Sequence, residues 1–340
     1  MPRPLVISAP EPRTLDLIFD PPALAALRER YRLVETDAAS VETLPPATLA
    51  EARYILGQPP LTAAAIDRLA SLRAIFNVEG NLLPNMPYEP LFARGVHVLT
   101  TAAVFAEPVA ELGLGLALAL ARGIVDADLA FREGREVWGL ESNRTARLLT
   151  GAEIGLVGYG ELGRALHRLL AAFRPRLRVF DPWLPDALVI EAGAEPASLQ
   201  TVLSTSDVVF VVAAVTSENR GFLDAAAFAT MREGASLILL SRADVVDFDA
   251  LTAAVARGHI TAASDVFPEE PLAPDHPVRK LPGFLRSAHR AGALDAAFKR
   301  MGELVLDDMA LLDRGLPPAR CKRAERETAG RLRSKPVARN

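Results

Sequence analysis

Three glycines with fixed spacing constrain the fold of this chain more than any other feature. Gly158, Gly160 and Gly163 follow an apolar run at 154–157 that predicts a strand, and they open a segment that predicts a helix. In that context the first glycine permits a tight turn, the second lets the backbone approach a pyrophosphate, and the third lets helix and strand pack closely. The free amides at the start of the helix favour an anion. The segment therefore predicts a dinucleotide site in a parallel α/β domain.

Asp181 is the acidic residue that a dinucleotide site of this kind requires. It ends the next predicted strand, 177–180, and lies 18 residues after Gly163, where a ribose-binding acid is expected. A 2′-phosphate would meet this carboxylate at a cost of about 3 kcal/mol per charge pair, at ~5 Å and an effective dielectric of ~20. The next residues, Pro182 and Trp183, add no positive charge. We therefore predict NAD rather than NADP as the cofactor.

Strand-like and helical segments alternate along the chain, which predicts parallel sheets with helices on both faces. The strand candidates are 5–7, 54–56, 74–76, 154–157, 177–180, 208–212, 236–240, 261–266 and 284–287. The helical patterns include 22–31, 62–71, 107–124 and 294–312. The fold class is therefore α/β with doubly wound sheets, and 340 residues are enough for about two domains.

The composition limits the possible partners and compartment. Apolar residues make up 50% of the chain and the net charge is −4, so neither nucleic acid nor an anionic membrane is expected as a partner. The longest apolar stretch, 112–121, is shorter than the roughly 20 residues that cross a bilayer. The first ten residues have no apolar core of signal-peptide length. The single cysteine, Cys321, fits a reducing compartment, and we expect a cytoplasmic protein.

Two further expectations follow from charge and ligand spacing. Residues 316–340 hold eight Lys or Arg and two Glu, which predicts a solvated and partly disordered end. The histidines and the cysteine show no metal-ligand spacing, so no metal is predicted.

Three polar residues follow consecutive predicted strands. Arg242 follows the strand at 236–240, Glu270 the strand at 261–266, and His289 the strand at 284–287. Open α/β sheets bind their ligands outside the carboxyl ends of the strands. We therefore expect these three side chains to face one cleft.

The chain resembles the D-isomer-specific 2-hydroxyacid dehydrogenase family, which includes phosphoglycerate dehydrogenase and the glyoxylate/hydroxypyruvate reductases. The resemblance is collinear from about residue 50 to 313. It is carried by GLVGYGELG (155–163), FDP (180–182), SRADVVDFDAL (241–251), DVFPEEPL (265–272) and SAHRAG (287–292), with VAE (109–111) and Arg122 in the long apolar helix.

The resemblance implies the domain organisation. It implies two Rossmann-like doubly wound domains, the smaller of them flavodoxin-like. Residues 1–105 and 291–340 would bind the substrate, and residues 106–290 would bind NAD. Family members commonly dimerise through the nucleotide domain, and the apolar helix at 107–124 fits that expectation, so we predict a homodimer. Trp138 is interpreted as a packing or subunit-contact residue.

The resemblance also implies a reaction and its residues. The family moves a hydride between NAD(H) and a small 2-hydroxy or 2-keto acid. His289 would be the acid/base, since a histidine pKa near 6.5 suits reversible proton transfer. Glu270 would favour its imidazolium form, and Arg242 would bind the substrate carboxylate and polarise the keto oxygen. The backbone of a first-domain loop would bind the same carboxylate, here at Val78, Glu79, Gly80 and Asn81.

The implied cofactor contacts extend beyond the glycines. Asp265 would lie near the nicotinamide amide, and Glu161 would contribute its backbone while its side chain turns to solvent. The full set is Gly158, Tyr159, Gly160, Glu161, Leu162, Gly163, Asp181, Ala213, Ala214, Val215, Asn219, Leu240, Ser241, Arg242, Asp265 and His289.

The chain departs from the family pattern at positions that line the cofactor and the substrate, so the substrate is left unassigned. The departures are Phe105, Ala106, Val212, Ala213, Ala214, Asn219, Leu239, Ala243, Ser287, Ala288 and Arg290. Arg290 either adds positive charge for a second anionic end of the substrate or points outward.

Two other functions are compatible with this fold. Formate dehydrogenase is disfavoured because it pairs its histidine with glutamine. An NAD-responsive regulatory protein like the corepressors of this fold stays open.

Overall fold

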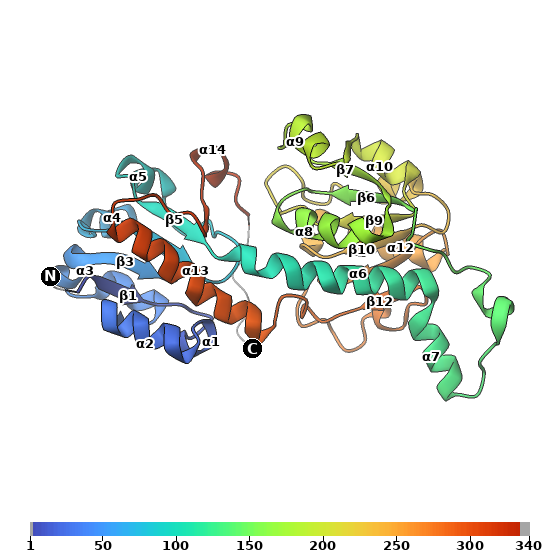
Figure 1. The fold of residues 1–340 in the computed structure, drawn as a ribbon, viewed down its shortest axis with the longest axis horizontal. Coiled ribbons are helices and arrows are strands. Elements are labelled where there is room, and N and C mark those ends of the chain that lie inside the picture. Colours follow the sequence, from blue (N-terminus) through green and yellow to red (C-terminus); the bar gives the residue numbers. More distant parts are fainter. Residues whose placement is uncertain (1–2, 334–340) are drawn as a thin grey trace. The chain divides into compact units, whose positions relative to one another are not determined.

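The computed structural model describes residues 3–333, and the chain divides into two compact α/β units. The first unit comprises Met1–Phe105, Thr216–Glu218 and Ala293–Asn340. The second comprises Ala106–Val215 and Asn219–Gly292. Each unit contains one sheet with helices on both of its faces (Figure 1), so the predicted fold class is confirmed.

The described part of the first unit has a six-stranded sheet in the order β13-β5-β4-β3-β1-β2. Its strands are β1 (Leu5–Ser8), β2 (Arg32–Glu35), β3 (Ala52–Leu56), β4 (Ala74–Asn77), β5 (His97–Thr100) and β13 (Lys322–Arg323). The first five are parallel and follow the flavodoxin order 2-1-3-4-5, while β13 adds antiparallel to β5. The order in which the chain adds strands therefore reverses between β1 and β3, which is the switch point of this fold.

Helices cover both faces of the first sheet because side chains alternate along each strand. Val6 points into the core beneath one set of helices, and its neighbours Leu5 and Ile7 point into the other core. One face carries α1 (Leu15–Ile18), α2 (Pro21–Arg30) and α13 (Asp295–Asp313); the other carries α3 (Pro46–Glu51), α4 (Ala63–Arg68) and α5 (Tyr88–Ala93). Local chemistry sets the helix ends: the Asp20 carboxylate accepts the Ala23 N–H at 2.7 Å, and Pro21 starts α2.

The second unit has a seven-stranded parallel sheet in the order β12-β11-β10-β9-β6-β7-β8. Its strands are β6 (Glu153–Val157), β7 (Arg176–Phe180), β8 (Glu195–Pro196), β9 (Val208–Val211), β10 (Ser236–Leu239), β11 (Thr261–Ser264) and β12 (Phe284–Arg286). This is the dinucleotide-binding order extended by a seventh strand, with its switch point between β6 and β9. The six strands predicted in this region are all present, with ends that differ by two residues or fewer.

The helices of the second unit also form two layers. One core lies under α6 (Ala106–Arg122), α8 (Glu161–Leu170) and α9 (Asp186–Glu191). The other lies under α10 (Leu199–Thr205), α11 (Ala225–Thr230) and α12 (Phe248–Ala256). Small residues let α6 lie close to its neighbours: a Cβ at Gly113 would stand 2.4 Å from the Leu240 side chain.

The predicted helix at 107–124 is present as α6, which ends two residues earlier than predicted. Gly123 takes a left-handed conformation (φ +59°) and ends α6, and α7 (Ile124–Arg132) starts in a new direction (Figure 1). By length and composition alone, the stretch Ala102–Arg122 could cross a membrane, with a mean hydropathy of 1.7. In the structure its α6 portion packs on α8 and β10, so this apolarity serves the core of the second unit.

The expectation of a partly disordered basic end is wrong for residues 316–333. This segment forms β13 and α14 (Arg326–Ala329) on the first unit, and Cys321 and Ala324 are buried. Asp308 anchors it, because its fully buried carboxylate accepts the N–H groups of Ala319, Arg320 and Cys321 at 2.7–2.9 Å. Residues 334–340, which complete the predicted tail, lie outside the described residues.

We predict that Asp308→Ala destabilises the protein by about 3 kcal/mol or more, because it leaves three N–H groups without their acceptor. The control is Asp307→Ala, one position away, which removes only an exposed ion pair with Arg320 and should cost about 0.5 kcal/mol or less. Urea unfolding of the full chain measures both. Equal stabilities of the two variants would show that the carboxylate does not anchor this segment.

Candidate active site

The glycine-rich turn after β6 has the packing that a dinucleotide loop requires. Gly158 has φ +99°, and a Cβ there would stand 2.7 Å from the Ala213 backbone nitrogen. A Cβ at Gly163 would stand 2.6 Å from the carbonyl oxygen of Gly158. At Gly160, by contrast, a Cβ would meet no atom within 4 Å. Two of the glycines are therefore required by packing, and the third leaves the open backbone surface that a pyrophosphate needs.

The start of α8 is able to receive an anion. Gly160 is the N-cap of this ten-residue helix and offers no side chain to its first N–H groups. Such uncapped amides, together with the helix dipole, favour a phosphate. The Glu161 side chain is exposed, as predicted, so its carboxylate is not confined beside these amides. The loop and helix start therefore fit the pyrophosphate of NAD.

Asp181 ties the end of β7 to the glycine-rich turn. Its carboxylate accepts the Tyr159 N–H at 2.8 Å and the Trp183 N–H at 3.0 Å. A cavity of about 340 Å³ lies beside it, and its lining includes Asp181, Pro182, Asp186, Ala197 and Ser198. The cavity thus lies beside the predicted ribose-binding acid, and two carboxylates line it.

The loop after β9 and the end of β10 supply the remaining predicted cofactor residues. The Asn219 side chain donates to the Ala214 carbonyl at 2.7 Å and closes the loop that also holds Ala213 and Val215. Leu240 is buried in the core beside α6, so only its backbone could face a ligand. The hydroxyl of Ser241 is buried and has no hydrogen-bond partner within the described chain, which is the kind of atom that a bound ligand can satisfy.

His289 and Glu270 form a hydrogen-bonded pair. The imidazole Nδ1 lies 2.5 Å from the Glu270 carboxylate, whose other oxygen accepts the Phe267 N–H at 2.9 Å. About a third of each side chain is exposed. Partial burial raises the pKa of Glu270, but the hydrogen bonds from His289 and Phe267, with the charges of His289 and Arg242, lower it on balance. Glu270 is therefore a carboxylate, and His289 Nδ1 is the donor to it.

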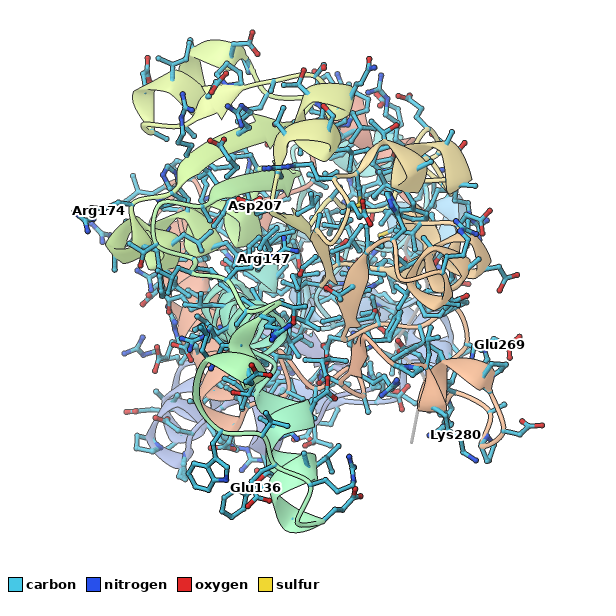
Figure 2. All side chains as sticks on the ribbon, turned by 90° about the vertical axis from the view of Figure 1, so that its right-hand side faces the viewer. Glu136, Arg147, Arg174, Asp207, Glu269 and Lys280 are labelled. Atoms are coloured by element: carbon cyan, nitrogen blue, oxygen red, sulfur yellow. The ribbon has the colours of Figure 1, made fainter. Side chains whose placement is uncertain are left out.

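Arg242 belongs to the same cluster. It follows β10 directly, donates to the carbonyl of Ser241 at 2.7 Å, and acts on Glu270 through its charge. Glu269, by contrast, is exposed, and its side chain reaches outward at the edge of the unit, as does that of Lys280 (Figure 2). The three residues singled out from the sequence thus gather at one edge of the second sheet, while the neighbouring acid does not join them.

The backbone of His289 is held in an uncommon conformation by Asp265. His289 has φ +48°, a left-handed conformation that is costly for a residue with a Cβ. The Asp265 carbonyl accepts the His289 N–H at 2.7 Å, and its two carboxylate oxygens accept the N–H groups of Arg290 and Ala291 at 3.1 Å each. Asp265 is 1% exposed, so this acid positions the histidine turn; its predicted contact with the nicotinamide stays a prediction.

The loop predicted to bind a substrate carboxylate is held by Asn77, which sequence reasoning missed. The Asn77 side-chain oxygen accepts the N–H groups of Glu79 and Gly80 at 3.1 and 3.0 Å. Its amide donates to the Asn81 carbonyl and to Gln58. An asparagine at a strand end before a Gly-containing loop is a recognisable turn signal. The predicted contact of this loop with the substrate carboxylate therefore depends on the N–H groups of Val78 and Asn81, because those of Glu79 and Gly80 are already bonded.

Proteins of known family have sequences and structures similar to this chain. The sequence profile of "D-isomer specific 2-hydroxyacid dehydrogenase, NAD binding domain" matches residues 114–291, more than half of the chain. The chain belongs to this family. It is therefore an oxidoreductase that acts on the CH–OH group of 2-hydroxy acids and binds NAD(H). The matched range lies almost wholly in the second unit, so this unit corresponds to the NAD-binding domain of the family.

Three named proteins show how similar this chain is to known relatives. A glyoxylate reductase of Thermofilum pendens is 36% identical over 234 residues, covering 66% of this chain and 68% of the relative. A D-3-phosphoglycerate dehydrogenase of Archaeoglobus fulgidus is 27% identical over 78% of this chain, which spans half of that protein. A crystal structure of a phosphoglycerate oxidoreductase from Rhizobium etli is 67% identical, with a TM-score of 0.89, covering 96% of this chain and all of that one.

We predict that Gly160→Ala raises the Kd for NADH by about tenfold or more, because the new methyl group occupies the surface that the pyrophosphate approaches. Its melting temperature should stay at the wild-type value, since a Cβ there meets no atom of the protein. Titration calorimetry with NADH measures the affinity. Glu161→Ala, the adjacent exposed residue, is the control and should bind NADH as the wild type does. Unchanged binding by Gly160→Ala would remove the pyrophosphate from this turn.

Proposed function

We propose that this 2-hydroxyacid dehydrogenase uses His289 as its acid/base, Glu270 as the partner that orients it, and Arg242 as the cation for the substrate carboxylate. The observation that carries the proposal is the pair of His289 and Glu270, beside Arg242, at the carboxyl edge of the NAD-binding sheet. Ligands of open α/β sheets bind at that edge. The regulatory alternative shares these residues, so turnover must be measured.

The hydrogen-bonding pattern assigns a task to each ring nitrogen of His289. Nδ1 donates to Glu270, so Nε2 is the nitrogen left to exchange a proton with the substrate oxygen. Glu270 stabilises the imidazolium that holds this proton before it passes to the keto oxygen. NADH, when bound, supplies the hydride for the keto carbon. Arg242 holds the carboxylate of the substrate and favours negative charge on its reacting oxygen.

The cofactor and substrate classes follow from the same unit and from the relatives. Asp181 and Asp186 in the cavity beyond β7 support NAD over NADP, because a 2′-phosphate would be repelled there. We propose the first unit, with the loop of Val78, Glu79, Gly80 and Asn81, as the substrate-binding unit. The relatives support a small substrate, in the size range of glyoxylate and phosphoglycerate. The reducing compartment that fits the single cysteine supports a cytoplasmic location.

A screen of small 2-keto acids with NADH and NADPH tests the activity. We expect steady-state oxidation of NADH with at least one keto acid, and a kcat/KM for NADH at least about tenfold above that for NADPH. Binding of NADH without turnover of any keto acid would favour the NAD-responsive regulatory protein. A tenfold preference for NADPH would overturn the role given to Asp181.

With the keto acid that the screen identifies, we predict that His289→Asn lowers kcat by about 10²–10⁴-fold, because the substrate oxygen then has no positioned proton donor. Glu270→Gln should lower kcat by about tenfold or more, since the amide no longer stabilises the imidazolium. The matched control is Glu269→Gln, which alters the neighbouring exposed acid and should leave kcat unchanged. NADH affinity should be retained in all three variants. Wild-type turnover by His289→Asn would contradict the proposal.

We also propose that the chain forms a homodimer through α7 and the segment that follows it. Large apolar side chains are exposed there: Ile124, Val125, Leu129, Phe131, Val137, Trp138, Leu140 and Leu148. Trp138 is 75% exposed and contacts the Phe131 ring edge-on, which supports its interpretation as a packing or subunit-contact residue. Glu136 lies in the same projecting segment (Figure 2). An apolar surface of this extent is typical of a protein interface.

We predict a solution mass of twice the 36.5 kDa chain for the wild type, measured by sedimentation equilibrium. Trp138→Asp places a charge in the apolar surface and should shift the mass toward that of one chain. The control is Leu316→Asp, a similarly apolar exposed site in the first unit, which should stay dimeric. A wild-type mass of one chain would refute the dimer.

A further inference from the structure

Arg13 lies at the switch point of the first sheet, where open α/β sheets bind ligands. It belongs to the loop between β1 and α1, and β1 is one of the two strands that flank the switch point. The neighbouring loops after β3 and β4 include Gln58 and the segment 78–81. The Arg13 side chain is half-buried at the carboxyl edge of this sheet, on the same edge as the loop proposed to hold the substrate carboxylate.

The guanidinium of Arg13 makes no hydrogen bond to the described part of the protein. Its central carbon lies 4.5 Å from the centre of the Phe298 ring, and its Nε is buried without an acceptor. Among the described residues, no carboxylate lies within 4.0 Å of it. Burial lowers the pKa of Arg13, while the charge of Glu79 raises it. A cation that is partly desolvated without an acceptor is costly unless a ligand supplies one.

Aromatic packing connects Arg13 to the loop at 78–81. Phe298, on which the guanidinium stacks, contacts Phe105 edge-on at 6.1 Å between ring centres. Phe105 in turn lies against Gly80, where a Cβ would stand 3.2 Å from its ring. The Gly80 carbonyl accepts the Thr100 hydroxyl at 2.5 Å, so the loop itself is fixed. The two rings thus connect the guanidinium to the loop, and Glu79 of that loop is near enough to act on Arg13 through its charge.

We propose that Arg13 binds a second anionic group, a phosphate or a carboxylate, at the far end of the 2-hydroxy acid. This inference rests on the proposed role of the loop at 78–81 in holding the substrate's own carboxylate. A planar guanidinium held over an aromatic ring keeps its N–H edges available for an oxyanion. Arg13 stays charged as arginines do in proteins, and Glu79, whose carboxylate lies more than 4.0 Å away, does not occupy those edges but disfavours an anion placed on its own side. Arg13 is thus a specificity residue, selecting substrates with two anionic ends over those with one.

The test compares ligands that differ only at the far end. The full chain carrying His289→Asn, saturated with NAD⁺, is titrated calorimetrically with glycerate, with 3-phosphoglycerate and with malate. We expect 3-phosphoglycerate or malate to bind more tightly than glycerate. Adding Arg13→Gln should weaken the preferred dianionic ligand by about tenfold or more while changing glycerate by less than about threefold. Arg13→Lys keeps the charge but loses the planar donor edge. Its affinity for the dianionic ligand should fall between those of the parent chain and of Arg13→Gln.

The outcomes separate a subsite from a structural role. Arg30→Gln, on the exposed end of α2, is the matched control and should leave all three affinities unchanged. An equal loss for glycerate and for the dianionic ligand would make Arg13 a structural residue and overturn the proposal. No preference for a dianionic ligand in the parent chain would overturn it as well. Failure to reduce any 2-keto acid would reject the proposed function, whereas the calorimetry still decides the role of Arg13.

Discussion

The candidate active site depends on one buried carboxylate, that of Asp265. Its two oxygens and its own carbonyl accept three consecutive N–H groups, those of His289, Arg290 and Ala291. These bonds offset the cost of the left-handed backbone at His289. That conformation aims Nδ1 at Glu270, on the side of the ring opposite the Nε2 that we propose as the proton donor to the substrate. Without the Asp265 carboxylate, the turn would lose two of the three hydrogen bonds that hold the imidazole in this place.

The sheet topology brings the chemical groups together without long loops. β10, β11 and β12 are adjacent and parallel, so Arg242, Glu270 and His289, which follow these strands, meet at one edge. The glycine-rich turn after β6 opens at the same carboxyl edge. In the first unit the same rule places Arg13 and the loop at 78–81 at the carboxyl edge of their own sheet. Each unit thus presents these polar groups at the carboxyl edge of its sheet.

Much of this was accessible from the sequence because its signals are local. Glycine spacing, strand-end polar residues and the acid after β7 predict the nucleotide turn and the meeting of Arg242, Glu270 and His289 at one sheet edge, while their roles follow from the family resemblance. The parts that sequence reasoning missed depend on contacts between distant residues. β13 exists because it pairs with β5 and because Asp308 holds the preceding turn. The end of α6 before Gly123 depends on the positive φ of this glycine, which the apolar pattern of the sequence does not show. Likewise, nothing local indicates that Asn77 occupies two amides of the substrate loop or that Arg13 stacks on Phe298.

The central claim is that His289 exchanges the proton of the substrate oxygen while Arg242 holds the carboxylate. A crystal structure of the wild-type chain with NADH and oxamate, a keto-acid mimic that is not reduced, tests it most directly. The account predicts His289 Nε2 at about 2.6–3.2 Å from the amide carbonyl oxygen of oxamate, which takes the place of the keto oxygen, with Nδ1 still bonded to Glu270. It also predicts the Arg242 guanidinium on the oxamate carboxylate. Oxamate bound with the imidazole turned to solvent, or held by other residues, would contradict it.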